Sequence, residues 1–205
     1  MIYNRIIQIP GVNDNCNDEE LERALSILSG ADVLMLQLEV PSWISVAAAQ
    51  AARLSGKLVL FNPAPVKPFS SDIYNFVDYI TPNAVEAEAL AERKIQDVGS
   101  AESVAMQLLR PHMRGVIITL GELGACYADH SRAGYVPGFS VDAVDTVGAG
   151  DAFNAALAVA LENREPIEQA IIRANGAGAL AVTKRGAQEA MPSLEELEAF
   201  LASNT

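Results

Sequence analysis

Two aspartates on either side of a glycine-rich elbow are the residues of this sequence best placed to do chemistry. They open and close the segment Asp-Thr-Val-Gly-Ala-Gly-Asp, which runs from Asp145 to Asp151. Residues 152–161 are largely apolar and favour a helix, so Asp151 falls in the first helical turn. Backbone N–H groups at a helix start lack intrahelical acceptors, and together with the helix dipole they favour anions. A carboxylate there can take a proton from a hydroxyl while the N–H groups hold the phosphoryl oxygens that the hydroxyl attacks.

The same residues also admit a structural interpretation. By spacing alone, residues 148–151 could form a tight turn whose aspartate caps the helix. Asn83 and Glu86 have the spacing of a helix capping box, in which the asparagine caps and the glutamate reaches back. Glu39 could be an ordinary loop carboxylate, and the glycines of residues 119–124 could make a hairpin turn. Spacing leaves both interpretations open.

Composition limits the class of protein. A length of 205 residues suits one domain, residues 1–205, with a full core. Hydrophobic residues make up 50% and charged residues 20%, which excludes a disordered chain and allows a buried sheet. The net charge of −12 argues against nucleic acid and against an anionic membrane as partner, because both reward basic patches. With no evident signal peptide and no apolar span of roughly 18 residues, we expect a cytoplasmic protein.

Short β-type runs alternate with helical patterns along the chain. The predicted strands are residues 6–9, 33–37, 58–61, 79–81, 115–120 and 140–144. The predicted helices are residues 18–29, 45–54, 85–91, 101–109, 149–162, 167–182 and 194–203. This alternation predicts a single α/β domain with a mainly parallel sheet and helices on both faces. Ligands of such sheets gather at the carboxyl ends of the strands, where Glu39, residues 119–124 and the elbow are expected.

Eight segments, in order along nearly the whole chain, match one family of enzymes. They are Pro-Gly-Val-Asn (10–13), Gln-Leu-Glu-Val-Pro (37–41), Phe-Asn-Pro-Ala-Pro (61–65), Thr-Pro-Asn-Ala-Val-Glu-Ala-Glu (81–88), Thr-Leu-Gly (119–121), the segment 145–151, Phe-Asn (153–154) and Ala-Val-Thr-Lys-Arg-Gly-Ala-Gln (181–188). Taken together, these segments resemble the ribokinase-like (PfkB-type) carbohydrate kinases. The signature at 145–151 is specific to that family, and the segment 181–188 resembles its ribokinases most closely.

The resemblance implies a reaction and roles for the matched residues. The reaction is ATP-dependent phosphorylation of a sugar hydroxyl, above all of ribose to ribose 5-phosphate. Asp151 would be the catalytic base, and Glu39 would bind the sugar together with it. The N–H groups of Gly148, Ala149 and Gly150 would form the anion hole for the transferred group.

The resemblance also implies a nucleotide site and two metal ions. Asn83 and Glu86 match an Asn-x-x-Glu pair tied to the phosphates and to hydrated Mg²⁺, and Asn175 falls where the family touches adenine. The residues implied in ATP binding are Asn83, Glu86, Thr119, Gly121, Gly124, Gly150 and Asn175. Those implied in holding K⁺, mostly through carbonyl oxygens, are Asp145, Val147, Ala181, Lys184, Gly186 and Ala190. Ala190 departs from the pattern, because the family has a serine there.

Before its matching part, the family carries a first βα unit with a sugar-binding aspartate, a Gly-Gly-Lys-Gly-x-Asn segment and most of a β lid. Residues 1–11 resemble none of these. We therefore expect weaker sugar binding, less exclusion of water, and an exposed sheet edge that favours self-association. Two alternatives stay open: a lidless nucleotide-binding remnant without kinase turnover, and a kinase of another sugar or nucleoside.

Overall fold

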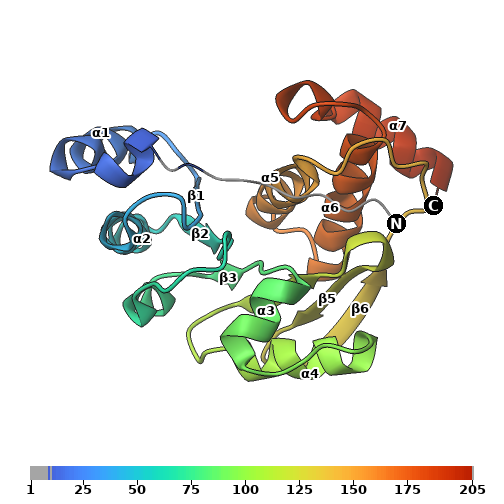
Figure 1. Ribbon diagram of the computed structural model, residues 1–205, viewed down its shortest axis with the longest axis horizontal. Helices are drawn as coiled ribbons and strands as arrows, with labels where there is room; N and C mark the ends of the chain where they lie inside the picture. The colour runs from blue at the N-terminus through green and yellow to red at the C-terminus, as the bar shows by residue number, and fades with distance from the viewer. Residues whose placement is uncertain (1–8, 10, 205) are drawn as a thin grey trace. The chain divides into compact units, whose positions relative to one another are not determined.

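The computed structural model describes residue 9 and residues 11–204, and Figure 1 traces the order of their elements. The described chain divides into two compact units. The C-terminal unit holds residues 120–125 and 135–204, and the N-terminal unit holds residues 9, 11–119 and 126–134. The expectation of a single domain over residues 1–205 stays a prediction.

The N-terminal unit is built around four parallel strands. They are β1 Val33–Leu36, β2 Leu58–Phe61, β3 Tyr79–Ile80 and β4 Gly115–Thr119, paired in that order. All of β2 is buried, and so are the first four residues of β4. Such unbroken apolar runs are typical of parallel strands covered on both faces. In β1, by contrast, every residue is only half-buried, and β1 stands at the end of the strand order.

Local hydrogen bonding fixes where most helices of the N-terminal unit begin. These helices are α1 Asp18–Leu28, α2 Ser42–Leu54, α3 Ala84–Ala91 and α4 Val98–Leu108, with short 3₁₀ turns η1 Gly11–Asn15 and η2 Ser71–Asn75. Capping boxes open three of them, formed by Asn17 with Glu20, Asn83 with Glu86, and Asp97 with Ser100. Each box satisfies N–H groups that the helix itself leaves unpaired. Helix α1 packs on α2, and α3 packs on α4.

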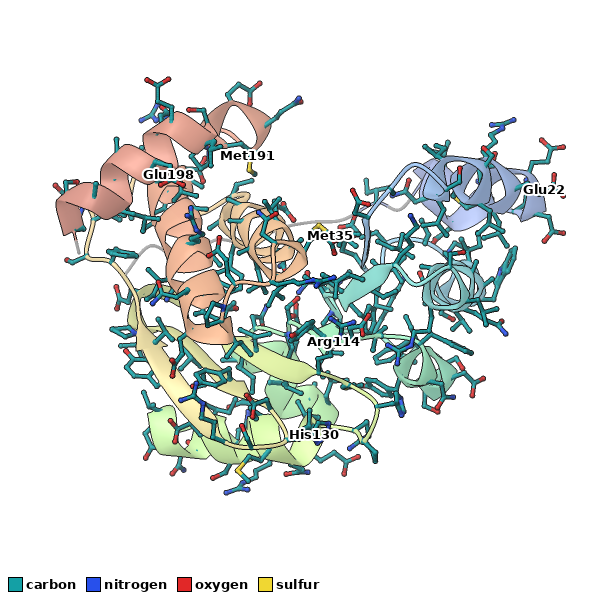
Figure 2. All side chains as sticks on the ribbon, turned by 180° about the vertical axis from the view of Figure 1, so that it is seen from behind. Glu22, Met35, Arg114, His130, Met191 and Glu198 are labelled. Carbon is teal, nitrogen blue, oxygen red and sulfur yellow. The ribbon has the colours of Figure 1, made fainter. Side chains whose placement is uncertain are left out.

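Small side chains let the helices of the C-terminal unit approach closely. These are α5 Ala149–Glu162, α6 Ile167–Val182 and α7 Leu194–Asn204, with 3₁₀ turns η3 Gly121–Leu123 and η4 Gln188–Ala190. Their core is a cluster of Ala152, Ala177, Ala181 and Leu197. At the surface, Arg173 of α6 bonds Glu198 of α7 at 2.6 Å; Figure 2 labels Glu198. The unit is therefore held by alanine-rich packing with ion pairs at its rim.

A hairpin completes the six-stranded sheet, whose strand order is β1-β2-β3-β4-β5-β6. Its strands are β5 Gly124–Ala128 and β6 Ala133–Pro137. In the turn between them, the N–H of Asp129 donates to the carbonyl of Arg132 at 2.9 Å. A connection this short joins antiparallel neighbours, so the sheet is parallel over β1 to β4 and ends in a hairpin. The predicted α/β fold with a mainly parallel sheet is confirmed.

The predicted strand at residues 140–144 is wrong. Those residues are irregular, and the N–H groups of Val144 and Asp145 donate to the carbonyl of Val182 at the end of α6. The segment therefore bonds to a helix end and not to a sheet neighbour. The sequence did not predict β5 and β6. The glycines of residues 119–124, for which a hairpin turn is one interpretation, lie in the connection between the neighbouring strands β4 and β5. The predicted strand at 6–9 lies outside the described residues except for Ile9, which is in no strand.

The other predicted elements are present, with ends that differ by at most three residues. Helices α5 and α6 and strand β2 have the predicted bounds. Helices α2 and α4 each begin three residues earlier than predicted, at Ser42 and Val98. Within the described part of the chain, no helix combines the length and the apolar character needed to cross a membrane.

Candidate active site

The elbow before α5 presents backbone N–H groups that no side chain caps. Gly148 is the N-cap in a left-handed conformation, with φ 79° and ψ −4°. A Cβ added to it would meet Met191 Cε at 3.0 Å and Ala187 at 3.4 Å, so both the conformation and the space require glycine. The N–H of Ala149 makes only a long contact of 3.4 Å to the carbonyl of Thr146. This end of α5 therefore has donors to offer an anion.

Asp151 is exposed in the first turn of α5. It does not cap the helix, so the interpretation of this elbow as a turn with a capping aspartate is wrong. Among the described residues, no hydrogen bond or ion pair engages its carboxylate. The next residues turn inward, and Asn154 bonds the carbonyl of Gly150 at 2.8 Å. The Asp151 carboxylate is thus left free to accept a proton from a ligand beside the N–H groups.

The carboxylate of Asp145 joins the elbow to the segment after α6. Its Oδ1 accepts from the N–H of Val147 at 3.1 Å, and its Oδ2 accepts from the N–H of Gly186 at 3.2 Å. These two backbone hydrogen bonds hold the pKa of Asp145 below its usual value. Asp145 therefore stays ionised at neutral pH and brings residues 145–147 and 181–186 side by side.

The donor atoms around Asp145 suit a monovalent cation. Within the described residues, no three His, Cys, Asp or Glu side chains gather as a metal site. The segments instead offer one carboxylate and several backbone carbonyls, the kind of oxygen that replaces the hydration shell of K⁺. Lys184 turns its ammonium to Glu196 at 2.7 Å, which leaves its carbonyl as its possible ligand. The Ala190 side chain is buried and offers no ligand atom, so only its carbonyl fits.

Asn83 and Glu86 form the capping box that their spacing predicted. The N–H of Asn83 donates to Glu86 Oε2 at 2.8 Å, and the N–H of Glu86 donates to Asn83 Oδ1 at 2.9 Å. Glu86 is 5% exposed, and this burial raises its pKa against the opposing effect of the Asn83 bonds. Thr119 lies beside them, because its N–H donates to the carbonyl of Pro82 at 3.0 Å. The capping interpretation is confirmed, and a role toward Mg²⁺ stays a prediction.

Two further predicted nucleotide contacts lie in a glycine turn of the C-terminal unit. Gly121 and Gly124 both have positive φ, at 63° and 103°. The turn closes through the N–H of Leu120, which donates to the carbonyl of Gly124 at 2.8 Å. An added Cβ on Gly124 would meet the carbonyl of Val136 at 2.3 Å. The turn is therefore compact, and at Gly124 it has no room for a side chain.

Asn175 is 7% exposed and is bound to the end of β6. Its Nδ2 donates to the carbonyls of Val136 and Pro137 at 3.3 and 3.1 Å. Both amide hydrogens are accounted for, so only Oδ1 remains for a ligand. An anchoring role was not anticipated from the sequence, since it depends on contacts almost forty residues away.

The predicted residues fall into two groups. The N-terminal unit brings Asn83, Glu86 and Thr119 together; Glu39 is exposed in the loop after β1 of the same unit. The C-terminal unit holds the elbow, Asp151, the cation segments, the glycine turn and Asn175. One contact that the sequence did not reveal is the bond from Asn62 Nδ2 to the carbonyl of Thr81 at 2.7 Å, which ties two of the matched segments.

Comparisons with known proteins identify the family. The family model of the pfkB family carbohydrate kinases matches residues 3–194. Ribokinase of Haemophilus influenzae is 34% identical over 97% of this chain and 65% of its own length. Deoxyribokinase of Salmonella typhi is 32% identical over 98% of this chain and 66% of its own length. This chain thus spans about two thirds of the length of these relatives.

Solved structures show the same fold. The crystal structure of Thermotoga maritima ribokinase superposes with a TM-score of 0.82 at 36% identity, over 98% of this chain and 66% of that one. Arabidopsis thaliana ribokinase, complexed with ribose and ATP, gives a TM-score of 0.86 at 25% identity, over 97% and 65% of the two chains. With its elbow, its Asn-x-x-Glu pair and this match over most of its length, the chain belongs to the pfkB family of carbohydrate kinases.

Proposed function

We propose that this protein transfers the γ-phosphate of ATP to a sugar hydroxyl, and that the sugar is ribose. The observation that carries the proposal is the uncapped start of α5, with the Asp151 carboxylate unengaged in its first turn. The relative from Arabidopsis that binds ribose and ATP supports this choice of substrates. The chain spans about two thirds of the length of its relatives. The activity is therefore proposed for the whole protein to which this sequence belongs.

The proposed reaction gives each part of the elbow a task. Asp151 removes the proton from the sugar hydroxyl, whose oxygen then attacks the γ-phosphorus while ADP leaves. The N–H groups of Gly148, Ala149 and Gly150 donate to the oxygens of the transferred group and stabilise the charge that develops there. Asp145 and the carbonyls around it would hold K⁺, whose charge would help to fix the direction of those N–H groups.

The remaining residues position the nucleotide and the sugar. Asn83 and Glu86 would bind the phosphates and the water shell of Mg²⁺, and the ion would supply positive charge to the leaving ADP. Thr119, Gly121 and Gly124 lie along the nucleotide. Asn175 has only Oδ1 unused, so it accepts from the amino group of adenine and does not donate to the ring. Glu39 binds sugar hydroxyls.

A second candidate function is nucleotide binding without turnover. It is favoured by the small number of sugar ligands proposed in the described residues, Glu39 and Asp151, both of which are exposed. Binding of ADP without any sugar-dependent release of ADP would support it. A third possibility, another pentose or a nucleoside as substrate, is raised by the Salmonella deoxyribokinase among the relatives.

We also propose that the chain associates with a second copy of itself through β1. The strand lies at the end of the sheet order, so one side of its backbone has no strand partner in the described chain. Helices α1 and α2, which pack together in the same unit, expose Ile27 by 71% and Leu54 by 82%. An apolar strand edge in such surroundings favours strand-to-strand pairing between copies.

Replacing Asp151 by Asn tests the proposed base. The variant keeps the size of the side chain but cannot take the proton, so kcat for ribose phosphorylation should fall by about 10²–10⁴-fold. Affinity for ADP should change little, because the elbow N–H groups remain. A coupled ADP-release assay and calorimetry measure the two quantities. Asp142→Asn, another exposed carboxylate of the same unit, is the matched control. Full activity in the Asp151 variant would overturn the assignment.

Replacing Glu86 by Gln separates capping from catalysis. Glutamine can also fill this position of a capping box, so stability should stay within about 1 kcal/mol of the wild type. The catalytic efficiency with MgATP should fall by about 10–100-fold, since the charge that orients the ion's water is lost. Glu20→Gln makes the same change in the capping box of α1 and should leave activity unchanged.

The same Glu86 variant has a signature in the pH dependence of unfolding. Because the pKa of Glu86 is raised on folding, its contribution to stability is complete below the unfolded pKa and is lost as pH rises through the folded pKa. Gln does not titrate. The stability of Glu86→Gln relative to the wild type should therefore improve from acid toward neutral pH, and an unchanged difference would contradict a raised pKa.

Potassium should raise both stability and activity. Thermal unfolding in KCl should occur at a higher temperature than in the same concentration of tetramethylammonium chloride, since a cation that binds only the folded state stabilises it. Turnover should fall about 10-fold without K⁺, because the elbow donors lose their orientation. Equal melting temperatures in the two salts would contradict the proposed cation site, whatever the activity.

Sedimentation of a Met35→Lys variant tests the β1 interface. A charged side chain on an edge strand opposes pairing, so the variant should be monomeric at concentrations where the wild type is a dimer. Figure 2 labels Met35. Met106→Lys introduces the same change on the exposed surface of α4 and should leave the dimer intact. A monomeric wild type, or a dimer that survives Met35→Lys, contradicts the proposal.

A further inference from the structure

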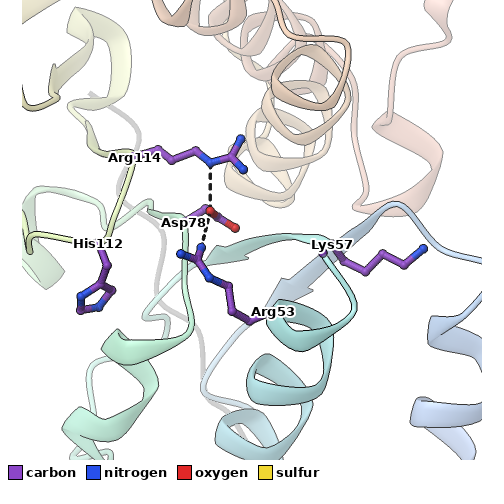
Figure 3. Close-up of a pocket in the computed structure, with 6 residues that line it drawn as sticks. Arg53, Lys57, Asp78, His112 and Arg114 are labelled. Carbon is purple, nitrogen blue, oxygen red and sulfur yellow. Dashed lines mark hydrogen bonds and ion pairs between the residues drawn. The ribbon is translucent and has the colours of Figure 1, made fainter.

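Four basic or imidazole side chains line an open hollow in the N-terminal unit (Figure 3). Arg53 comes from the last turn of α2 and Lys57 from the turn that enters β2. His112 and Arg114 come from the segment before β4. The hollow has a volume of about 170 Å³, room for roughly five water molecules. Gly56 also lines it, and an added Cβ on Gly56 would meet nothing within 4 Å.

The one carboxylate of this hollow is already saturated. Asp78 is 1% exposed; its Oδ1 accepts from Arg53 Nη1 at 2.7 Å and forms an ion pair with Arg114 Nε at 3.0 Å. Its Oδ2 accepts from the N–H of Val59 at 3.0 Å. Burying an ionised carboxylate is costly unless a cation pairs with it, and one guanidinium would be enough to pair with Asp78. Two are held here side by side, so the hollow keeps an excess of positive charge in a chain whose net charge is −12.

The excess charge comes with unused hydrogen-bond donors. Each guanidinium has five N–H donors; one of Arg53 is used in the hydrogen bond to Asp78, and Arg114 contacts Asp78 through Nε alone. Their side chains remain 38% and 62% exposed. The ammonium of Lys57 makes one contact, to the carbonyl of Ser29 at the hydrogen-bond limit of 3.5 Å. His112 is held in place by its ring bond to the carbonyl of Tyr74.

We propose that this hollow binds a small oxyanion of the phosphate type. Two planar guanidinium groups fixed by one carboxylate present forked donors that fit tetrahedral phosphate oxygens. Lys57 lines the same hollow, with its ammonium turned to the carbonyl of Ser29 in this structure (Figure 3). The anion would also relieve the repulsion between the two guanidinium groups. Purely structural pairing of Asp78 would need only one of them, and would not need Lys57, which makes no contact with Asp78.

This site is distinct from the proposed nucleotide site. Asp78 and Asn83 stand at opposite ends of β3, and Arg114 and Thr119 stand at opposite ends of β4. Five residues of extended chain at about 3.3 Å each separate the two ends by roughly 16 Å. Both pairs belong to the N-terminal unit. The oxyanion therefore binds at the amino ends of the strands, while the Asn-x-x-Glu pair lies at their carboxyl ends.

The test is titration of the ADP-saturated protein with inorganic phosphate, followed by backbone amide NMR. The amides of Val59 and Arg114 should shift and saturate with a dissociation constant of roughly millimolar order. Sodium chloride at matched ionic strength should not reproduce the shifts. Lys57→Gln and Arg114→Gln should each weaken phosphate binding at least several-fold. Arg93→Gln, which removes an exposed arginine elsewhere in the same unit, should not.

Two outcomes would overturn the proposal. One is the absence of saturable shifts at Val59 and Arg114, or their reproduction by chloride. The other is unchanged phosphate affinity in Lys57→Gln, which leaves the Asp78 pairing intact and so tests binding even if Arg114→Gln fails to fold. A parallel titration with ribose 5-phosphate distinguishes the source of the ligand. Tighter binding identifies a phosphomonoester, and equal affinity identifies the free anion.

Discussion

The carboxylate of Asp145 is the constraint on which the candidate site depends. Its two oxygens accept backbone N–H groups from Val147 and Gly186, and so join two loops that lie about forty residues apart in the chain. These two hydrogen bonds hold residues 145–147 against residues 181–186. They therefore help to fix the left-handed turn at Gly148 and the direction of the N–H groups after it. The hydrogen bonds also lower the pKa of Asp145, which keeps its negative charge next to the carbonyls proposed for a cation.

The chain uses carboxylates in three distinct environments, and the environment sets the task. Asp145 is bound by backbone donors, Asp78 is bound by two guanidinium groups, and Asp151 has no partner in the described chain. The first two hold loops and strands in place. The third is kept unengaged at the start of a helix, which is the condition for a carboxylate that must take a proton and release it in every cycle.

Much of the fold was predictable from local signals. Helices α5 and α6 have the expected bounds because a glycine and a proline mark their starts and the apolar period continues without interruption between them. The spacing of Asn83 and Glu86 also predicted the capping box at the start of α3. The strand predicted at 140–144 is wrong because a local sequence pattern does not show which segment will accept its hydrogen bonds, and here the acceptor is the end of α6. The contact of Met191 with Gly148 and the anchoring of Asn175 depend on tertiary packing, and no local pattern encodes them.

The difference between capped and uncapped helices bears on the order in which the protein folds. Helices α1, α3 and α4 are stabilised at their starts by residues a few positions away, so they can begin to form within their own segments. Helix α5 has no such cap, and its buried face is completed only against α6. Helix α6 follows α5 after only residues 163–166, so the two helices can pair as a local helical hairpin. We therefore expect the start of α5 to become ordered when that hairpin forms, and the starts of α1, α3 and α4 to become ordered within their own segments.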